Sequence, residues 1–256
     1  MRQHLIAANW KMYKTPEEAT TFLNTLETLL PPNTQTQPQT VVFPSTTSLP
    51  AAVTAASGTG IAIGAQNMHW LDAGAYTGET SPTMLLALGV THILIGHSER
   101  RQFFGETDEI VNRKLKAALA HSLIPIVCVG EHLDQRESNQ TSEVLEHQVS
   151  VALAGIDPAQ ASSLTFAYEP VWAIGTGKTA TPQIAEDAHK IIRRLIANSL
   201  GNDLAQSTRI LYGGSVKPDN ARSLCCLDDV DGALVGGASL DPTSFADIVK
   251  GADGSR

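Results

Sequence analysis

The stretch Ile124-Pro125-Ile126-Val127-Cys128-Val129 is continuously apolar, and seven further short apolar runs are spread along the 256 residues of the chain. A strand that is apolar at every position is typical of a parallel sheet covered on both faces. Longer segments with helical spacing separate the runs, so the sequence predicts alternating strands and helices. The runs are residues 5–8, 41–43, 61–65, 93–95, 124–129, 164–167, 210–212 and 233–235.

Several of the helical segments open with Ser, Thr or Asp followed by proline. The first side chain can accept a hydrogen bond from an unpaired N–H of the first turn, and proline at the first helical position loses no needed donor. Glu18 predicts a capping box with Thr15. Gly89 and Gly201 stand where a helix end favours positive φ. The four pairs are Thr15-Pro16, Ser81-Pro82, Thr181-Pro182 and Asp241-Pro242.

The alternation runs through residues 1–256 without a linker-like break. This favours a single domain, a closed eight-stranded β/α barrel, over its main rival, a doubly wound open sheet. Two stretches have the composition of loosely ordered surface, the Pro/Gln/Thr-rich tract 31–40 and the tail 251–256. We therefore expect the ordered barrel to cover about residues 1–250.

Charge and cysteine content restrict the partners and the compartment. The formal net charge of −8 argues against nucleic acid and acidic membranes as partners, which select basic surfaces. A phosphate site in such a chain must be built locally from backbone N–H groups and a lysine. Three cysteines form no disulfide framework, and we find no secretory segment and no apolar run that could span a membrane. We therefore expect a cytoplasmic protein.

Polar residues and glycines follow most of the apolar runs directly. The C-terminal ends of the strands form the functional face of β/α barrels, so these residues are the first candidates for a site. They are Asn9 and Lys11, Pro44 and Ser45, Gln66 and Asn67, His97 and Ser98, Glu131, Glu169, Gly213 to Ser215, and Gly236 and Gly237.

Seven motifs between residues 9 and 240 resemble motifs of the triosephosphate isomerase family and follow one another in the same order as in that family. The resemblance implies a single-domain (β/α)8 TIM barrel. It also implies the reversible interconversion of glyceraldehyde 3-phosphate and dihydroxyacetone phosphate through an enediolate, a step of glycolysis and gluconeogenesis, with no cofactor and no metal. The motifs are Asn9-Trp10-Lys11, Gly64-Ala65-Gln66-Asn67, Gly74-Ala75-Tyr76-Thr77-Gly78-Glu79, Gly96-His97-Ser98-Glu99-Arg100-Arg101, Ala167-Tyr168-Glu169-Pro170-Val171-Trp172-Ala173-Ile174-Gly175-Thr176-Gly177, Tyr212-Gly213-Gly214-Ser215-Val216 and Gly236-Gly237-Ala238-Ser239-Leu240.

The resemblance gives three residues catalytic roles. Glu169 is implied to be the base that removes a proton from the carbon beside the carbonyl, and desolvation under a closed lid would strengthen that base. His97 is implied to be a neutral electrophile that polarises the carbonyl and moves protons between the two oxygens. Lys11 is implied to place a positive charge beside the reacting oxygen and the phosphate.

The same resemblance implies how the substrate is held. Asn9 and Lys11 would hold the reacting end by hydrogen bonds. Backbone N–H groups of Gly175, Ser215, Gly236 and Gly237 would grip the phosphate, since glycine lets the backbone approach an anion closely.

Residues 170–179 are predicted to form a lid that excludes water. Gly177-Lys178-Thr179 within it imitates the end of a P-loop, but Trp172 stands where that motif needs a glycine. We therefore expect no nucleotide site.

Supporting roles are implied for Ser98, Glu99 and Thr77. Glu99 is expected to pair with Lys11, and Arg100 and Glu106 are further charges near the site. The loop from Gln66 to Glu79 resembles an arm that reaches into a neighbouring subunit and predicts a homodimer. In it, Thr77 would brace Asn9 of the partner subunit and Lys11 of the partner subunit.

Two alternatives keep the barrel and the phosphate site. One is another sugar-phosphate isomerase or lyase on a phosphate-binding barrel. The other is a non-catalytic scaffold that binds a phosphate metabolite. Loss of the base or the electrophile would indicate the scaffold, and both residues are present.

Overall fold

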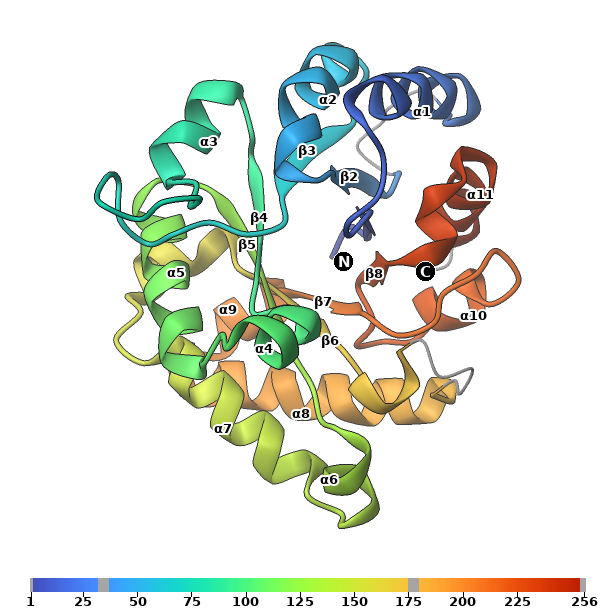
Figure 1. Ribbon diagram of the computed structural model, residues 1–256. Coiled ribbons are helices and arrows are strands. Elements are labelled where there is room, and N and C mark those ends of the chain that lie inside the picture. Colours follow the sequence, from blue (N-terminus) through green and yellow to red (C-terminus); the bar gives the residue numbers. More distant parts are fainter. Residues whose placement is uncertain (1, 32–36, 175–179, 254–256) are drawn as a thin grey trace.

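Eight parallel strands form a closed barrel in chain order, with β1 hydrogen-bonded to β8 (Figure 1). The computed structural model describes residues 2–31, 37–174 and 180–253. The closed barrel confirms the predicted fold and excludes the doubly wound sheet. Its strands are β1 (Leu5–Asn9), β2 (Gln39–Phe43), β3 (Ala62–Ala65), β4 (His92–Ile95), β5 (Ile124–Val129), β6 (Thr165–Tyr168), β7 (Arg209–Tyr212) and β8 (Gly232–Val235).

Helices surround the barrel and cover the outer face of the strands (Figure 1). None of them, within the described residues, has the length and apolarity needed to cross a bilayer. The α-helices are α1 (Pro16–Leu29), α2 (Leu49–Ala56), α3 (Pro82–Leu88), α4 (Ser98–Phe104), α5 (Asp108–Ala120), α6 (Leu133–Glu137), α7 (Thr141–Leu153), α8 (Pro182–Leu200), α9 (Asn202–Ser207), α10 (Ala221–Cys225) and α11 (Pro242–Ala252). Four short 3-10 helices are η1 (Thr46–Ser48), η2 (Pro158–Ser163), η3 (Val171–Ala173) and η4 (Gly237–Leu240).

The helix starts lie where the sequence predicts them. Each residue before the four prolines accepts a hydrogen bond from the backbone N–H three positions on, which satisfies one donor of the first turn. Thr15 and Glu18 form the predicted capping box. Gly89 and Gly201 end α3 and α8 with φ of 87° and 95°. Local capping chemistry therefore fixes where these helices begin and end.

Two apolar layers form the core. One fills the barrel interior, with side chains such as Phe43, Leu94, Ile126 and Leu211. The other lies between the strands and the helices. Because both faces of each strand are buried, the strands read as continuous apolar runs in the sequence.

Both stretches expected to be loose are partly ordered. Gln39 and Thr40 already belong to β2, and α11 continues through Gly251 to Ala252. Ala252 is buried and its carbonyl oxygen lies 3.1 Å from Nδ1 of His4, so packing orders the first two residues of the expected tail. Residues 32–36 and 254–256 lie outside the described part.

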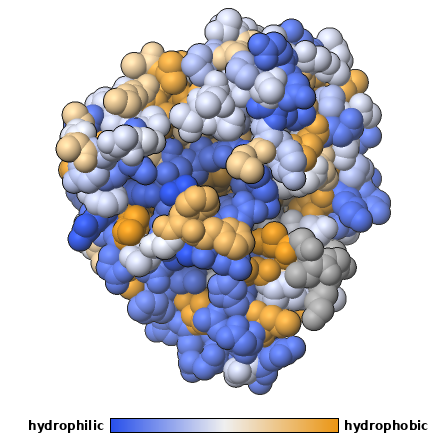
Figure 2. Space-filling model, viewed as in Figure 1, coloured by the Kyte–Doolittle hydropathy of each residue, from blue (hydrophilic) through white to orange (hydrophobic). Residues whose placement is uncertain are grey.

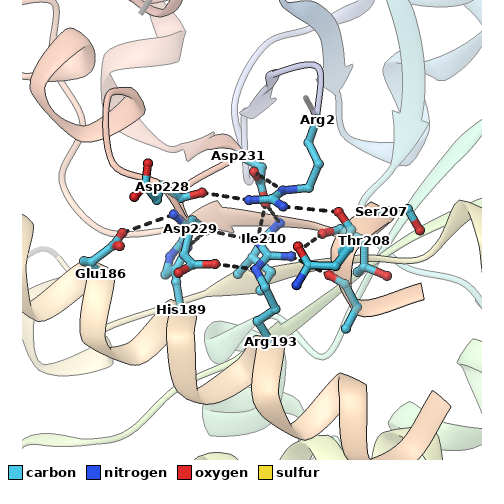
Figure 3. A network of polar contacts seen from close by, with 12 residues as sticks. Arg2, Glu186, His189, Arg193, Ser207, Thr208, Ile210, Asp228, Asp229 and Asp231 are labelled. Atoms are coloured by element: carbon cyan, nitrogen blue, oxygen red, sulfur yellow. Dashed lines mark hydrogen bonds and ion pairs between the residues drawn. The ribbon is translucent and has the colours of Figure 1, made fainter. Parts of the chain in front are cut away.

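A buried network of charges lies at the N-terminal ends of β7 and β8 (Figure 3). Asp231 is fully buried, and its Oδ1 accepts a hydrogen bond from Nε of Arg2 at 2.6 Å. Its Oδ2 accepts from Nη2 of Arg193 at 2.7 Å and from the Ile210 amide at 2.9 Å. Arg193 also pairs with Asp229 through Nε. The network ties the N-terminal segment and α8 to the start of β7 and β8.

Candidate active site

Glu169 follows β6 directly, and its side chain is almost completely buried. The residue is 2% exposed, and its amide donates to the Val129 carbonyl of β5 at 2.8 Å. A Cβ atom added at Gly130 would lie 1.7 Å from the carbonyl oxygen of Glu169, and one added at Gly213 would lie 2.9 Å from its Cγ. Glycine at these two positions therefore lets the neighbouring strand ends close around Glu169.

Three donors hold the Glu169 carboxylate. Nε2 of His97 lies 3.0 Å from Oε1. Ser98 donates its backbone N–H to Oε2 at 2.9 Å and its hydroxyl to Oε1 at 3.0 Å. Ser98 is the first residue of α4, where backbone N–H groups have no partner inside the helix. The start of α4 thus supplies the donors that fix the carboxylate.

Burial and these donors act on the pKa of Glu169 in opposite directions. Burial is the largest effect and raises the pKa, but the charge of His97 and the hydrogen bonds from His97 and Ser98 outweigh it. The pKa of Glu169 therefore lies below its ordinary value of 4.5. In this arrangement Glu169 is held as a stabilised carboxylate, and the strengthening of the base under a closed lid stays a prediction.

His97 is buried opposite Glu169. The Glu99 amide donates to Nδ1 of His97 at 3.3 Å, so Nε2 carries the ring proton that points to Glu169. The contact at Nδ1 fits the tautomer of a neutral ring, and the neutral state that the resemblance implies stays a prediction. Burial lowers the pKa of His97, but the charge and hydrogen bond of Glu169 and the charge of Glu99 outweigh burial and raise that pKa above 6.5.

Lys11 occupies an unusual backbone conformation for a residue with a side chain, with φ of 54°. Two side chains hold it there. Oδ1 of Asn9 accepts from the Lys11 amide at 3.0 Å, and Nε2 of Gln66 donates to the Lys11 carbonyl at 2.8 Å. Nζ of Lys11 lies 2.7 Å from Oε1 of Glu99, which is the expected pairing. The turn after β1 thus directs the ammonium toward α4.

One cavity of about 460 Å³ joins these groups at the C-terminal ends of the strands. Apolar side chains lie over α4 on this face (Figure 2), where Phe103 and Phe104 are each 67% exposed and Phe103 lines the cavity. Thr77 is exposed in its loop and does not line it, and Gly175 lies outside the described residues. The other residues to which the resemblance gives a catalytic, binding or supporting role line the cavity: Asn9, Lys11, His97, Ser98, Glu99, Glu169, Ser215, Gly236 and Gly237. The strand-end candidates Pro44, Ser45, Gln66, Asn67 and Glu131 are not among its lining residues.

A larger cavity of about 570 Å³ lies at the opposite end of the barrel. It is bordered by the first residues of several strands, among them Leu5, His92 and Ile124. None of the expected site residues lines it. Volume alone therefore does not identify the site, whereas the convergence of carboxylate, imidazole and ammonium does.

Comparison with known proteins agrees with this geometry. The profile of the family described as Triosephosphate isomerase matches residues 4–252. The chain belongs to the triosephosphate isomerase family. The triosephosphate isomerases of Solibacter usitatus and Caldanaerobacter subterraneus are each 52% identical to it over 250 residues, which cover 98% of this chain and 100% of each relative. That of Moorella thermoacetica is 53% identical over 251 residues, covering 98% of this chain and 99% of the relative.

Glu131 is a further buried residue of this triosephosphate isomerase family member, and the sequence indicates it only as a strand-end candidate without a role. Its Oε1 accepts from the hydroxyl of Tyr168, from Nε1 of Trp172 and from Nη1 of Arg136, each at 3.0 Å. The Val171 amide donates to the Glu131 carbonyl at 3.1 Å. Glu131 thereby fixes the chain on both sides of Glu169. The only sign of this residue in the sequence was its position as a single carboxylate just after the apolar run 124–129.

No group of three or more His, Cys, Asp or Glu side chains within residues 2–31, 37–174 and 180–253 is arranged to hold a metal ion. The expectation that the family reaction needs no metal and no cofactor stays a prediction. Residues 175–179 of the expected lid lie outside the described residues, whereas Val171 to Ala173 form η3.

Proposed function

We propose that Glu169, His97 and Lys11 catalyse the interconversion of glyceraldehyde 3-phosphate and dihydroxyacetone phosphate in this chain. The reaction class follows from family membership, which makes the chain an intramolecular aldose-ketose isomerase acting on triose phosphates. One observation carries the residue roles. A buried carboxylate, an imidazole and an ammonium from β6, β4 and β1 face a single cavity.

Substrate binding would break the contact between Glu169 and His97, and each side chain would then contact the substrate. The carbonyl oxygen of the substrate replaces Oε1 of Glu169 as the acceptor of the His97 Nε2–H. The carboxylate then loses the His97 contact, one of the contacts that lowered its pKa, while it remains buried, so its basicity rises. Burial thus acts on catalysis only after the resting contacts of Glu169 are broken.

The released carboxylate takes a proton from the carbon beside the carbonyl. The electron pair of that C–H bond forms a carbon–carbon double bond, and the carbonyl electrons move to oxygen to give the enediolate. The protonated Glu169 then returns the proton to the neighbouring carbon. His97 carries a proton between the two oxygens, so no atom is gained or lost.

Developing negative charge on oxygen is stabilised by His97 and Lys11, and Asn9 supports the Lys11 turn. Preorganised donors of this kind stabilise the transition state because they need no rearrangement when charge appears. Backbone N–H groups of Ser215, Gly236 and Gly237, with Gly175 from the lid, would hold the phosphate. Lid closure would exclude water, which protects the enediolate from losing phosphate.

A coupled isomerase assay on wild type and Glu169→Gln tests the proposal. Glutamine keeps the shape of the side chain and removes the base, so we expect kcat to fall by roughly 10² to 10⁴-fold. Glu143→Gln changes an exposed glutamate of α7 and should leave kcat unchanged. An inactive folded wild type, or full activity of Glu169→Gln, would disprove the proposal.

Two measurements separate this function from the alternatives. A panel of longer sugar phosphates should give little turnover, because a larger sugar would hinder closure over Glu169. Exchange of substrate carbon-bound hydrogen in deuterated water should accompany turnover. Binding without exchange would indicate the non-catalytic scaffold.

We also propose that the chain forms a homodimer through the loop from Gln66 to Glu79. Residues 71–79 are exposed, and Gln66 ties the base of the loop to the Lys11 turn. Met12 and Tyr13, which follow Lys11, are 93% and 58% exposed, so apolar surface lies beside the site. In the dimer, Thr77 would brace Asn9 of the partner subunit and Lys11 of the partner subunit. Light scattering should give twice the 27.2 kDa chain mass, and a mass of one chain would contradict the dimer.

A cytoplasmic location completes the proposal. Cys128, Cys225 and Cys226 form no disulfide with one another, which suits a reducing compartment, and glycolysis supplies the substrate there. Cell fractionation should find the isomerase activity in the cytoplasmic fraction, and recovery in a secreted fraction would contradict this placement.

A further inference from the structure

Lys217 stands out among the charged residues that line the active-site cavity. The described lining contains two lysines, Lys11 and Lys217, and two glutamates, Glu99 and Glu169. Lys11 is paired with Glu99 at 2.7 Å, whereas no ion pair joins Lys217 to a carboxylate of the described residues. Lys217 is also exposed to solvent. It therefore offers an uncommitted positive charge at the rim of the cavity.

The backbone around Lys217 is firmly held. Oδ1 of Asn220 accepts from the Lys217 amide at 2.8 Å, and Nδ2 of Asn220 donates to the Ser215 carbonyl at 3.1 Å. The Ala221 amide, at the start of α10, donates to the Lys217 carbonyl at 3.0 Å. Asn220 thus fixes Ser215 and Lys217 relative to each other. The backbone of Lys217 is therefore held in place, while the four-carbon side chain leaves the ammonium free to follow a ligand.

The net charge of the whole chain makes a positive charge at this rim matter for the association of an anionic substrate. A formal net charge of −8 repels a phosphate dianion at a distance. Without Lys217, the described cavity lining would carry one lysine against two glutamates. Exposed charges at the mouth of a cleft act mainly on the rate of association and lose their effect as salt rises.

We propose that Lys217 is a substrate-binding residue that captures the phosphate dianion of the incoming triose phosphate at the rim and guides it toward the Ser215 amide. The proposal deepens the isomerase function and rests on it for the identity of the substrate. It assigns Lys217 to association and holding of the anion. No proton transfer passes through this residue.

Steady-state kinetics of Lys217→Gln, Lys217→Arg and Lys116→Gln test the assignment. Lys116 is an exposed lysine of α5 that does not line the cavity, so Lys116→Gln makes the same charge change elsewhere. At low ionic strength we expect Lys217→Gln to lower kcat/KM on the order of three- to tenfold, with kcat little changed. The difference should vanish in high salt, and Lys217→Arg and Lys116→Gln should resemble wild type.

Two further measurements exclude a merely structural role. Unphosphorylated glyceraldehyde carries no anion, so its turnover should not respond to Lys217→Gln. Binding of inorganic phosphate, followed by phosphorus NMR, should weaken several-fold in Lys217→Gln and needs no turnover. Phosphate binding therefore tests Lys217 even if the isomerase assay fails. Equal effects of Lys217→Gln and Lys116→Gln, an equal loss with glyceraldehyde, or no rescue by arginine would overturn the proposal.

Discussion

The two ends of the barrel both bury carboxylates, but they hold them differently. At the C-terminal ends of the strands, Glu169 is bound by His97 and Ser98 beside an open cavity. At the N-terminal ends, Asp231 is bound by Arg2 and Arg193 (Figure 3), and neither Asp231 nor Arg193 lines either of the two cavities described above. Burial of a charge is therefore no sign of catalysis by itself. What distinguishes the site is space in which a substrate can replace the present partners.

The comparison predicts that damage at the two ends will appear in different measurements. Substitutions around Asp231 should change the free energy of unfolding and leave turnover intact. Substitutions around Glu169 should act mainly on turnover, with a smaller effect on the free energy of unfolding that depends on pH. The following experiments measure stability and turnover in variants at the two ends of the barrel and, last, at a helix start outside both sites.

The largest expected effect is on stability, in Asp231→Asn. Removing this charge leaves the buried guanidinium of Arg193 with a weaker partner, and breaking a buried ion pair typically costs about 3 to 5 kcal/mol. Chemical denaturation should show this loss while kcat stays near wild type. Asp247→Asn changes a half-exposed aspartate of α11 and should have no measurable effect. A loss of kcat in folded Asp231→Asn would break the division between the two ends.

Turnover should respond next most strongly, in His97→Gln. Glutamine keeps a hydrogen-bond donor but lacks the ring, and loss of one donor aimed at a developing oxyanion typically costs about 10² to 10³-fold in kcat. The thermal unfolding midpoint should stay close to wild type. His147→Gln, at an exposed position of α7, is the matched control. If both variants lose activity alike, His97 has no special role.

A smaller effect concerns the pH dependence of stability. The pKa of Glu169 is lowered from 4.5. Its contribution to the free energy of unfolding is therefore present above pH 4.5 and is lost as pH falls through the pKa of the folded state. The pKa of His97 is raised from 6.5. Its contribution to the free energy of unfolding is therefore fully present below pH 6.5 and is lost as pH rises through the pKa of the folded state. The stability difference between wild type and Glu169→Gln should therefore be largest between pH 4.5 and 6.5.

NMR titration of the His97 ring gives the companion measurement. In Glu169→Gln the pKa of His97 should fall, because burial remains while the main partner that raised it is gone. An unchanged His97 pKa would mean that the two side chains do not interact in solution.

The smallest expected effect is at the capping box of α1, whose residues belong neither to the Glu169 site nor to the Asp231 network. Thr15→Ala removes the side chain that accepts from the Glu18 amide and should cost about 1 kcal/mol of stability. Turnover should not change. Thr21→Ala, at an exposed position inside α1, is the control, because alanine favours a helix interior. Equal destabilisation by both variants would argue against a capping role.

Local chemistry explains how much of the fold the sequence could predict. Continuous apolar runs marked the strands because both their faces are buried, and pairs such as Thr181-Pro182 marked helix starts because capping is local. Ala252 belongs to the expected tail but ends α11, since its burial near His4 depends on a contact across the whole chain.

The site could be predicted only in part for the same reason. The residues at the strand ends were found because a barrel brings those ends together. The lowered pKa of Glu169 could not be found, since its donors come from Ser98 and His97, about 70 residues earlier. Glu131 was found only as a strand-end candidate, because its contacts with Tyr168 and Trp172 depend on the fold, and Lys217 was missed because it resembles any surface lysine.

Gly130 has a consequence for experiments that replace every position of this chain in turn. A Cβ there would overlap the carbonyl oxygen of Glu169, at 1.7 Å, so even alanine must displace the backbone that carries the base. A mutational scan would therefore rank Gly130 with the reacting side chains, although it has no functional group to offer. Its intolerance would measure the closeness of two strand ends, and only a readout of backbone position would separate it from a true catalytic loss.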